Sequence, residues 1–248
     1  MRILNFLILA IVAIFLVPAA ASAAIWYFGD HATSWRTADW SSSGMLPPAR
    51  EVEGARVYVF SARTGGLKGA VSEHSWIVVK EKGAEEYERW DKVGWGTPVR
   101  HNGYPADGRW YSNEPRVVFS AEGDAAETLI PKLRDAIASY PFAMRGGYHI
   151  FPGPNSNSFV AHVMRQVPEI DVSLPPVSVG RDYPTNGRLA FLDPDRRDLH
   201  LSLFGYAGVS AGWKSGLEIN LFGLVAGIDA RRIGIKVPAF GTFALLDG

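Results

Sequence analysis

Residues 71–80 read VSEHSWIVVK, and their apolar side chains alternate with the period of a β-strand. Trp76 falls on one face of the expected strand and Ile77 on the other. Residues 55–62, ARVYVFSA, show the same alternation. The two segments therefore predict two β-strands.

Further strands are expected on both sides of this pair. Residues 87–93 and 116–120 predict a third and a fourth strand, and residues 94–113 between them form a long loop rich in Gly, Pro, Asn and aromatic residues. A loop of this length in a compact domain is often functional. Two late strands, 217–228 and 232–237, are expected to finish the sheet.

A first helix is expected after the fourth strand. Residues 124–127, DAAE, have the form of a capping box in which Asp124 accepts from the backbone and Glu127 folds back. Apolar residues then recur at helical spacing until Tyr140-Pro141.

A second helix is expected to begin at Asn155 or Ser156, directly after Pro-Gly-Pro, and to end at Pro168. The order strands, helices, strands predicts an α+β fold, a mostly antiparallel sheet with two packed helices. We expect residues 55–248 to form a single globular domain of this kind.

Residues 1–28 predict export from a bacterial cytoplasm. Arg2 precedes an unbroken apolar run over 6–17, and Ala21-Ser22-Ala23 fits the pattern that a signal peptidase cleaves. The alternative is an uncleaved anchor, because apolar character continues to Phe28 and the stretch is long enough to span a bilayer. Both alternatives place the domain outside the cytoplasm, either periplasmic or anchored in the inner membrane and facing the periplasm.

Residues 29–54 are irregular and predict an extended arm rich in tryptophan. Trp35 and Trp40 lie in this arm, where they either pack on the domain or lie close to the membrane.

Composition excludes several kinds of chemistry. The chain has no cysteine, so neither disulfides nor thiolate catalysis are available. Lys plus Arg equals Asp plus Glu at 25 each, which argues against a nucleic-acid partner. No His-x-Glu or His-x-x-x-His spacing and no Gly-rich phosphate loop is present, so we expect neither a metal site nor a cofactor.

Ser156 and His74 are the candidate catalytic residues. A hydroxyl at the first turn of a buried helix lies beside unpaired backbone N–H groups, a natural place for a nucleophile and an oxyanion hole. The alternative for Ser156 is a helix cap, since Asn and Ser are preferred N-caps. The alternative for His74 is a packed core residue, because it lies in a strand beside Trp76.

The chain as a whole resembles a bacterial family of uncharacterised exported or membrane-anchored proteins, a domain-of-unknown-function family. The segments that carry this resemblance are Trp35-Arg36-Thr37-Ala38-Asp39-Trp40, Glu73-His74-Ser75-Trp76, Gly153-Pro154-Asn155-Ser156-Asn157-Ser158-Phe159 and Glu218-Ile219-Asn220-Leu221. The resemblance to this family implies no particular activity.

The order of a strand His followed by Asn-x-x-x-Phe at a helix start is also similar to circularly permuted papain-like proteins, of the NlpC-like and lecithin–retinol acyltransferase-like kinds. The resemblance implies a catalytic set of three residues, with His74 in the base position, Asn155 as the motif Asn and Ser156 in the nucleophile position. Phe159 takes the position of the motif aromatic. Serine replaces the cysteine of those families, and a hydroxyl needs proton removal during attack. His101 and Glu88 are the candidates for a third polar group that orients the base.

Three hypotheses follow. The first is a serine-dependent hydrolase or acyltransferase that acts on an amide or ester of the cell envelope, with peptidoglycan or lipid as the partner. The second is a catalytically inactive binding module of the envelope, and the third is a structural or assembly protein. If the N-terminal segment is uncleaved, the inner membrane is itself a partner.

Overall fold

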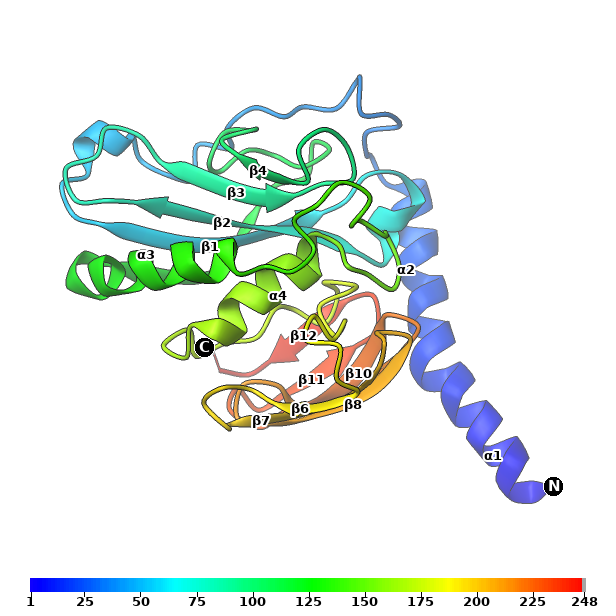
Figure 1. Cartoon of the computed structure of the whole chain (residues 1–248). Coiled ribbons are helices and arrows are strands. Elements are labelled where there is room, and N and C mark those ends of the chain that lie inside the picture. Colours follow the sequence, from blue (N-terminus) through cyan, green and yellow to red (C-terminus); the bar gives the residue numbers. More distant parts are fainter. Residues whose placement is uncertain (247–248) are drawn as a thin grey trace.

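The computed structural model describes residues 1–246 as two antiparallel sheets with helices between them, beside one long N-terminal helix (Figure 1). The chain is thus a mixed α and β protein with few helices, as the order of the elements predicts.

The first sheet has the strand order β4-β3-β2-β1-β5. Its strands are β1 (Arg56–Arg63), β2 (Glu73–Lys80), β3 (Glu88–Lys92), β4 (Val99–His101) and β5 (Arg116–Glu122). The four strands expected from the alternation of residues are confirmed within a few residues, and β4 is an additional strand inside the expected loop.

Two helices cover one face of this sheet. They are α3 (Gly123–Ala138) and α4 (Ser156–Gln166), and their apolar sides pack against Val57, Val59 and Ile77. The capping box expected at Asp124 is wrong: the N-cap of α3 is Glu122, two residues earlier, and no side chain caps the helix. Asp124 therefore lies inside the first turn, where its charge favours the helix dipole but its carboxylate does not cap.

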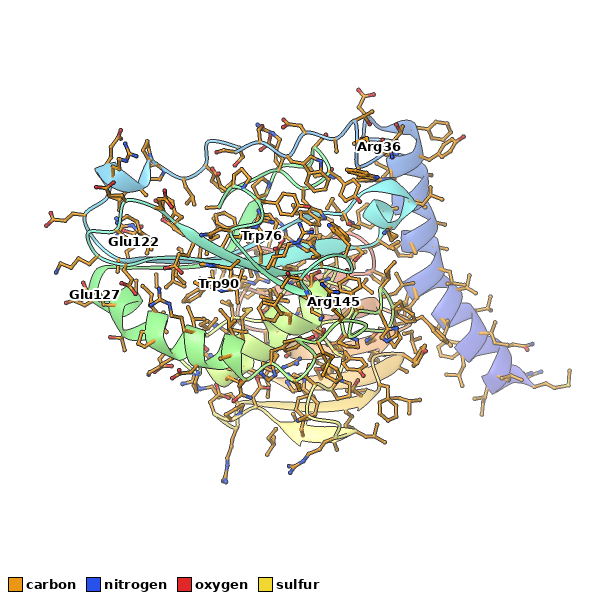
Figure 2. All side chains as sticks on the ribbon, turned by 45° about the horizontal axis from the view of Figure 1, so that its top comes forward. Arg36, Trp76, Trp90, Glu122, Glu127 and Arg145 are labelled. Atoms are coloured by element: carbon orange, nitrogen blue, oxygen red, sulfur yellow. The ribbon has the colours of Figure 1, made fainter. Side chains whose placement is uncertain are left out.

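The opposite face of the first sheet is covered by the loop that follows β3 and by the N-terminal arm. Trp40 of the arm stacks on Tyr104 and meets Trp110 edge to face, so this tryptophan packs on the domain, whereas Trp35 stays exposed. Trp76 and Trp90, both labelled in Figure 2, belong to the two opposite faces of the sheet.

The second sheet is a meander of seven strands in the order β12-β11-β10-β9-β8-β7-β6. Its strands are β6 (Ala190–Leu192), β7 (Asp198–Leu203), β8 (Ala207–Gly212), β9 (Gly216–Leu221), β10 (Leu224–Asp229), β11 (Gly234–Val237) and β12 (Gly241–Ala244). It forms the lower layer of the molecule in Figure 1, below α4.

The expectation that two late strands finish one sheet is wrong. The segment 217–228 is a hairpin whose two-residue turn, Phe222-Gly223, has positive φ at both residues, 51° and 83°. Such a turn matches the twist of paired strands, but Phe in place of Asn or Asp conceals it in the sequence. The strands on either side pair with each other and with new neighbours, so they build a separate sheet.

The N-terminal segment is a continuous apolar helix, Arg2–Phe28. It consists of α1 (Arg2–Ile11), a π-helical turn η1 (Val12–Leu16) and α2 (Val17–Phe28). By length and composition it is compatible with either a signal sequence or a membrane anchor.

Candidate functional site

The start of α4 is capped by Asn155. Its Oδ1 accepts hydrogen bonds from the backbone N–H groups of Asn157 (2.9 Å) and Ser158 (3.0 Å), and the Ser158 Oγ accepts from the Asn155 N–H at 2.7 Å. The Asn155 Nδ2 donates to the carbonyl oxygens of Ile150 and Val179, each at 3.0 Å. The amide is therefore fully occupied in holding the helix start, and Asn155 positions the site without being free to react.

Ser156 is the first residue of α4 and is not its cap. The cap bonds take up the N–H groups of the next two residues, whereas the Ser156 N–H has no acceptor within residues 1–246. An unpaired N–H at a helix start carries the positive end of the dipole. Ser156 is 3% exposed, and its polar neighbour is the Tyr148 hydroxyl. Burial raises the pKa of Tyr148 to about 12, and the charge of Asp91 raises it further, whereas the hydrogen bond with Ser156 lowers it.

His74 is the second residue of β2, and its ring is fixed on two sides. The ring lies flat on Trp110, with 3.6 Å between the centroids and 4° between the planes. Its Nε2 is 3.1 Å from the Asp91 Oδ2 of β3, and Arg89 Nη2 donates to the same oxygen at 3.2 Å. Because an ionised carboxylate can only accept, Nε2 carries the proton and Nδ1 is left with a lone pair.

Burial sets the charge of this pair. Burial lowers the pKa of His74, although the hydrogen bond and charge of Asp91 act in the opposite direction. For Asp91, burial alone would raise the pKa, but the hydrogen bond from His74 and the charge of Arg89 hold it below the usual value. The result is a neutral imidazole beside an ionised carboxylate, which is the state that a general base requires.

His74 and Ser156 open on the same pocket, of about 250 Å³. The helix α4 covers the face of the sheet that bears Ile77, whereas the His74 ring belongs to the opposite face with Trp76. Ser156 and His74 nevertheless line one pocket, because His74 lies at the start of β2, where Asn157 Nδ2 of α4 donates to the carbonyl oxygen of the preceding Glu73 at 2.8 Å.

No hydrogen bond joins the Ser156 Oγ to the His74 ring in the part of the chain that the structure describes. The His74 Nδ1 is likewise without a partner there, and it is not among the fully enclosed polar atoms. In unliganded enzymes catalytic hydrogen bonds are often long or poorly aligned, and they tighten when substrate binds.

The acidic residue that contacts the His74 ring is Asp91, and neither His101 nor Glu88 contacts it. These two contact each other, with 3.0 Å between His101 Nε2 and Glu88 Oε2, on the exposed edge of the first sheet away from His74. The sequence carries one signal for Asp91: Arg89 and Asp91 are two residues apart in a strand, so both charged side chains lie on the same face. The fold buries both of them.

Comparison with known proteins places the chain in a family. Residues 54–183, just over half of the chain, match the family described as "Protein of unknown function (DUF3750)", and the chain belongs to this family. The match includes the first sheet, α3 and α4, and with them Ser156, His74 and Asp91; it ends before β6. No curated protein and no solved structure matches the chain.

Proposed function

We propose that this protein is a serine-dependent hydrolase or acyltransferase of the bacterial cell envelope. The observation that carries the proposal is one pocket lined both by Ser156, at the first position of α4, and by a neutral His74 whose Nε2 is bound to Asp91. A nucleophile, a base and a group that orients the base are the three parts that acyl transfer by serine requires.

The chemistry follows from the free atoms. The Ser156 Oγ attacks the carbonyl carbon of an ester or amide while His74 Nδ1 takes its proton, and Asp91 stabilises the imidazolium that forms. The Ser156 N–H and the Tyr148 hydroxyl are the donors for the oxyanion. The His74 proton then passes to the leaving alcohol or amine, and water or an acceptor alcohol or amine releases the acyl group from Ser156.

The lining of the pocket favours an acyl group with an apolar chain. Ile150, Phe151 and Leu224 contribute apolar surface, and Lys68 supplies a cation. The envelope as the location is inferred from the apolar helix Arg2–Phe28. The similarity to permuted papain-like proteins supports the same roles, because the strand His and the Asn-Ser helix start occur in the expected order.

Labelling with a fluorophosphonate probe tests the proposal. The purified full-length chain should be labelled, and Ser156→Ala should abolish labelling while the surface variant Ser139→Ala retains it. Ser156→Ala should also keep its melting temperature, since Asn155 is the cap. A chain that resists the probe, or a Ser156→Ala variant that is still labelled, contradicts the assignment of the nucleophile.

The second candidate is a binding module that keeps the cleft without turnover. The observation in its favour is the His74 ring, which stacks on Trp110 and contacts Asp91 but makes no hydrogen bond to Ser156 within the described residues. Under this alternative the wild type resists the probe but sediments with isolated peptidoglycan or with lipid vesicles, and pocket variants at Ile150 weaken that binding.

A further inference from the structure

The second sheet buries its polar residues and exposes its apolar ones. In β7, Asp198, His200 and Ser202 are buried, whereas the leucines between them are exposed. The same inversion recurs in β9, where Glu218 and Asn220 are buried between exposed Leu217 and Ile219. An antiparallel sheet of a water-soluble domain has the opposite pattern, with its polar face in solvent.

The exposed side of this sheet, here called the outer face, is continuous across the strands. One cross-strand row consists of Leu199, Ala211, Leu217, Ile228, Ile235 and Phe243. Within strands β6–β12, every residue of the outer face is Ala, Val, Leu, Ile, Phe or Gly. An apolar surface this extensive marks an interaction site, because soluble monomers rarely expose one.

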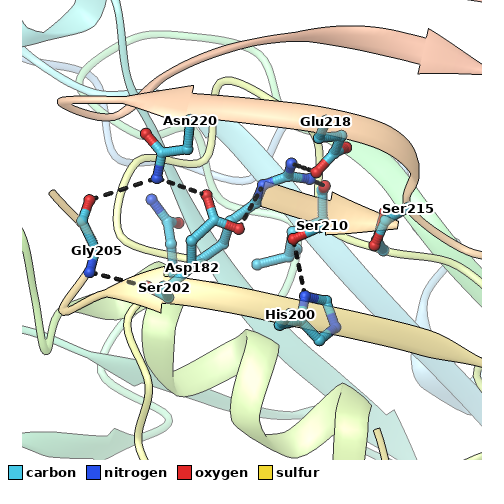
Figure 3. Close-up of polar contacts among 12 residues, drawn as sticks. Asp182, His200, Ser202, Gly205, Ser210, Ser215, Glu218 and Asn220 are labelled. Atoms are coloured by element: carbon cyan, nitrogen blue, oxygen red, sulfur yellow. Dashed lines mark hydrogen bonds and ion pairs between the residues drawn. The ribbon is translucent and has the colours of Figure 1, made fainter. Parts of the chain in front are cut away.

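The inner face cannot exchange places with the outer one. Glu218 lies between Arg181 and Lys236 and accepts hydrogen bonds from both, and all three side chains are buried (Figure 3 shows Glu218 and its neighbours). Burial alone would raise the pKa of Glu218, but the two cations hold it below the usual value. If the sheet were turned over, Arg181 would be left buried without its carboxylate partner, which is strongly destabilising. The apolar outer face is therefore a fixed property of the fold.

The N-terminal helix is attached beside this sheet. Ser22 Oγ donates to the Ala70 carbonyl oxygen at 2.5 Å and Trp26 Nε1 to that of Gly66 at 3.0 Å, so α2 is held against the connection between β1 and β2, the short helix Gly66–Ala70. Trp26 rests on Gly69, where a Cβ would be only 2.2 Å from the indole ring. At the middle of the helix, η1 contacts β10, and Phe15 is 5% exposed.

The helix then leaves the domain on the side of the outer face. The segment α1 has no buried residue, and in Figure 1 it extends past the level of the second sheet. A bilayer entered by α1 would lie on the side of the domain to which the outer face is turned. Apolar residues turned outward and polar residues turned inward are also the arrangement of β-structure that contacts lipid.

We propose that the outer face of the β6–β12 sheet rests on the lipid bilayer that the N-terminal helix enters. The helix and the sheet then act as one membrane-binding surface, with the first sheet and its pocket held above it. This inference does not depend on catalysis by Ser156. Leu224 of β10 lines the pocket, however, so a membrane-bound sheet brings the pocket close to the lipid.

Single cysteines test this proposal, because the chain has none of its own. Ile219, 47% exposed at the centre of the outer face, is replaced by cysteine in the full-length chain and labelled with the fluorophore NBD. The matched control is Glu86→Cys, in the exposed turn between β2 and β3. Each protein is reconstituted in phosphatidylethanolamine and phosphatidylglycerol vesicles with and without doxyl-labelled phosphatidylcholine.

We expect the label at position 219 to shift its emission to the blue and to lose most of its intensity with doxyl lipid, whereas the label at position 86 does neither. A label at position 219 that is shielded but insensitive to doxyl lipid, with efficient cross-linking between two copies through that cysteine, would show that a second copy covers the face and overturn the proposal. A water-exposed label at position 219 would overturn it as well, and so would mass spectrometry showing that the mature chain begins at Ala24.

The membrane contact and the catalytic role of the pocket are tested by different measurements, so either can be refuted without the other. Ile219 does not line the pocket, so the labelled variant should react with the fluorophosphonate probe as the wild type does. Loss of doxyl quenching with normal probe labelling would contradict only the membrane contact, and the reverse result only the catalytic assignment.

Discussion

Replacing Ser156 by cysteine measures the electrostatics of the site directly. The chain has no other cysteine, so the rate of alkylation by iodoacetamide reports one thiol. Only the thiolate reacts, and the midpoint of the rate against pH therefore gives the ionisation of that group. An ordinary thiol has its midpoint at about 8.5.

The structure separates two contributions to this midpoint. The helix start contributes about 0.3–1 kcal/mol, which lowers the midpoint by less than about one pH unit, since one unit corresponds to about 1.4 kcal/mol. A histidine that takes the proton and remains beside the thiolate lowers it by roughly one to three units more. The Nδ1 of His74 is free to do so, because its Nε2 is bound to Asp91.

The matched control is Ser156→Cys combined with His74→Gln. We expect the single variant to show a midpoint near or below neutrality and the double variant to return to about 8, the value that the helix end alone supports. Equal midpoints in the two proteins would mean that His74 does not reach position 156. The arrangement in the pocket would then be structural, and the hydrolase assignment would be refuted.

Three further predictions concern stability. Phe159→Ala should lower the free energy of unfolding in urea by about 3–5 kcal/mol, because Phe159 is fully buried against Tyr140. The control Leu67→Ala, at an exposed residue, should lower it by less than about 0.5 kcal/mol. A small effect at Phe159 would mean that α4 does not pack as described. Asn155→Ala should lower stability by about 0.5–2 kcal/mol, and equal losses in Asn155→Ala and Ser156→Ala would contradict the cap assignment. Burial lowers the pKa of Lys92 from 10.5 to about 8, so the folded chain binds fewer protons than the unfolded chain between these values, and unfolding free energy should rise with pH across that window. Lys92→Met should remove this rise, and an unchanged pH dependence would show that Lys92 is not buried as a cation.

Much of the site could be found in the sequence because its signals are local. The strands that carry His74 and Asp91 alternate with a period of two, and the start of α4 is marked by Pro-Gly-Pro followed by a capping residue. These local signals indicate Ser156 and His74 as separate candidates, the resemblance to papain-like proteins implies that they share one site, and both line one pocket. The apolar helix Arg2–Phe28 is equally a matter of composition.

The partner of His74 was decided by strand pairing. Asp91 reaches the ring because β3 pairs with β2, and register across a sheet is set by contacts distant in the sequence. Glu88 lies on the same strand three residues earlier, and its side chain points to the other face, where it meets His101. A shift of one residue exchanges the faces, and residue type alone gives no means to choose between them.

The second sheet shows the same limit on a larger scale. The sequence by itself determined that apolar and polar residues alternate along segments such as 217–221. Only the tertiary structure decided which side is buried: Arg181 and Lys236 surround Glu218 on the inner face, and the apolar side chains are left outside. Alternation has a period but no direction, because the side of a strand that faces inward depends on what the rest of the chain packs against it.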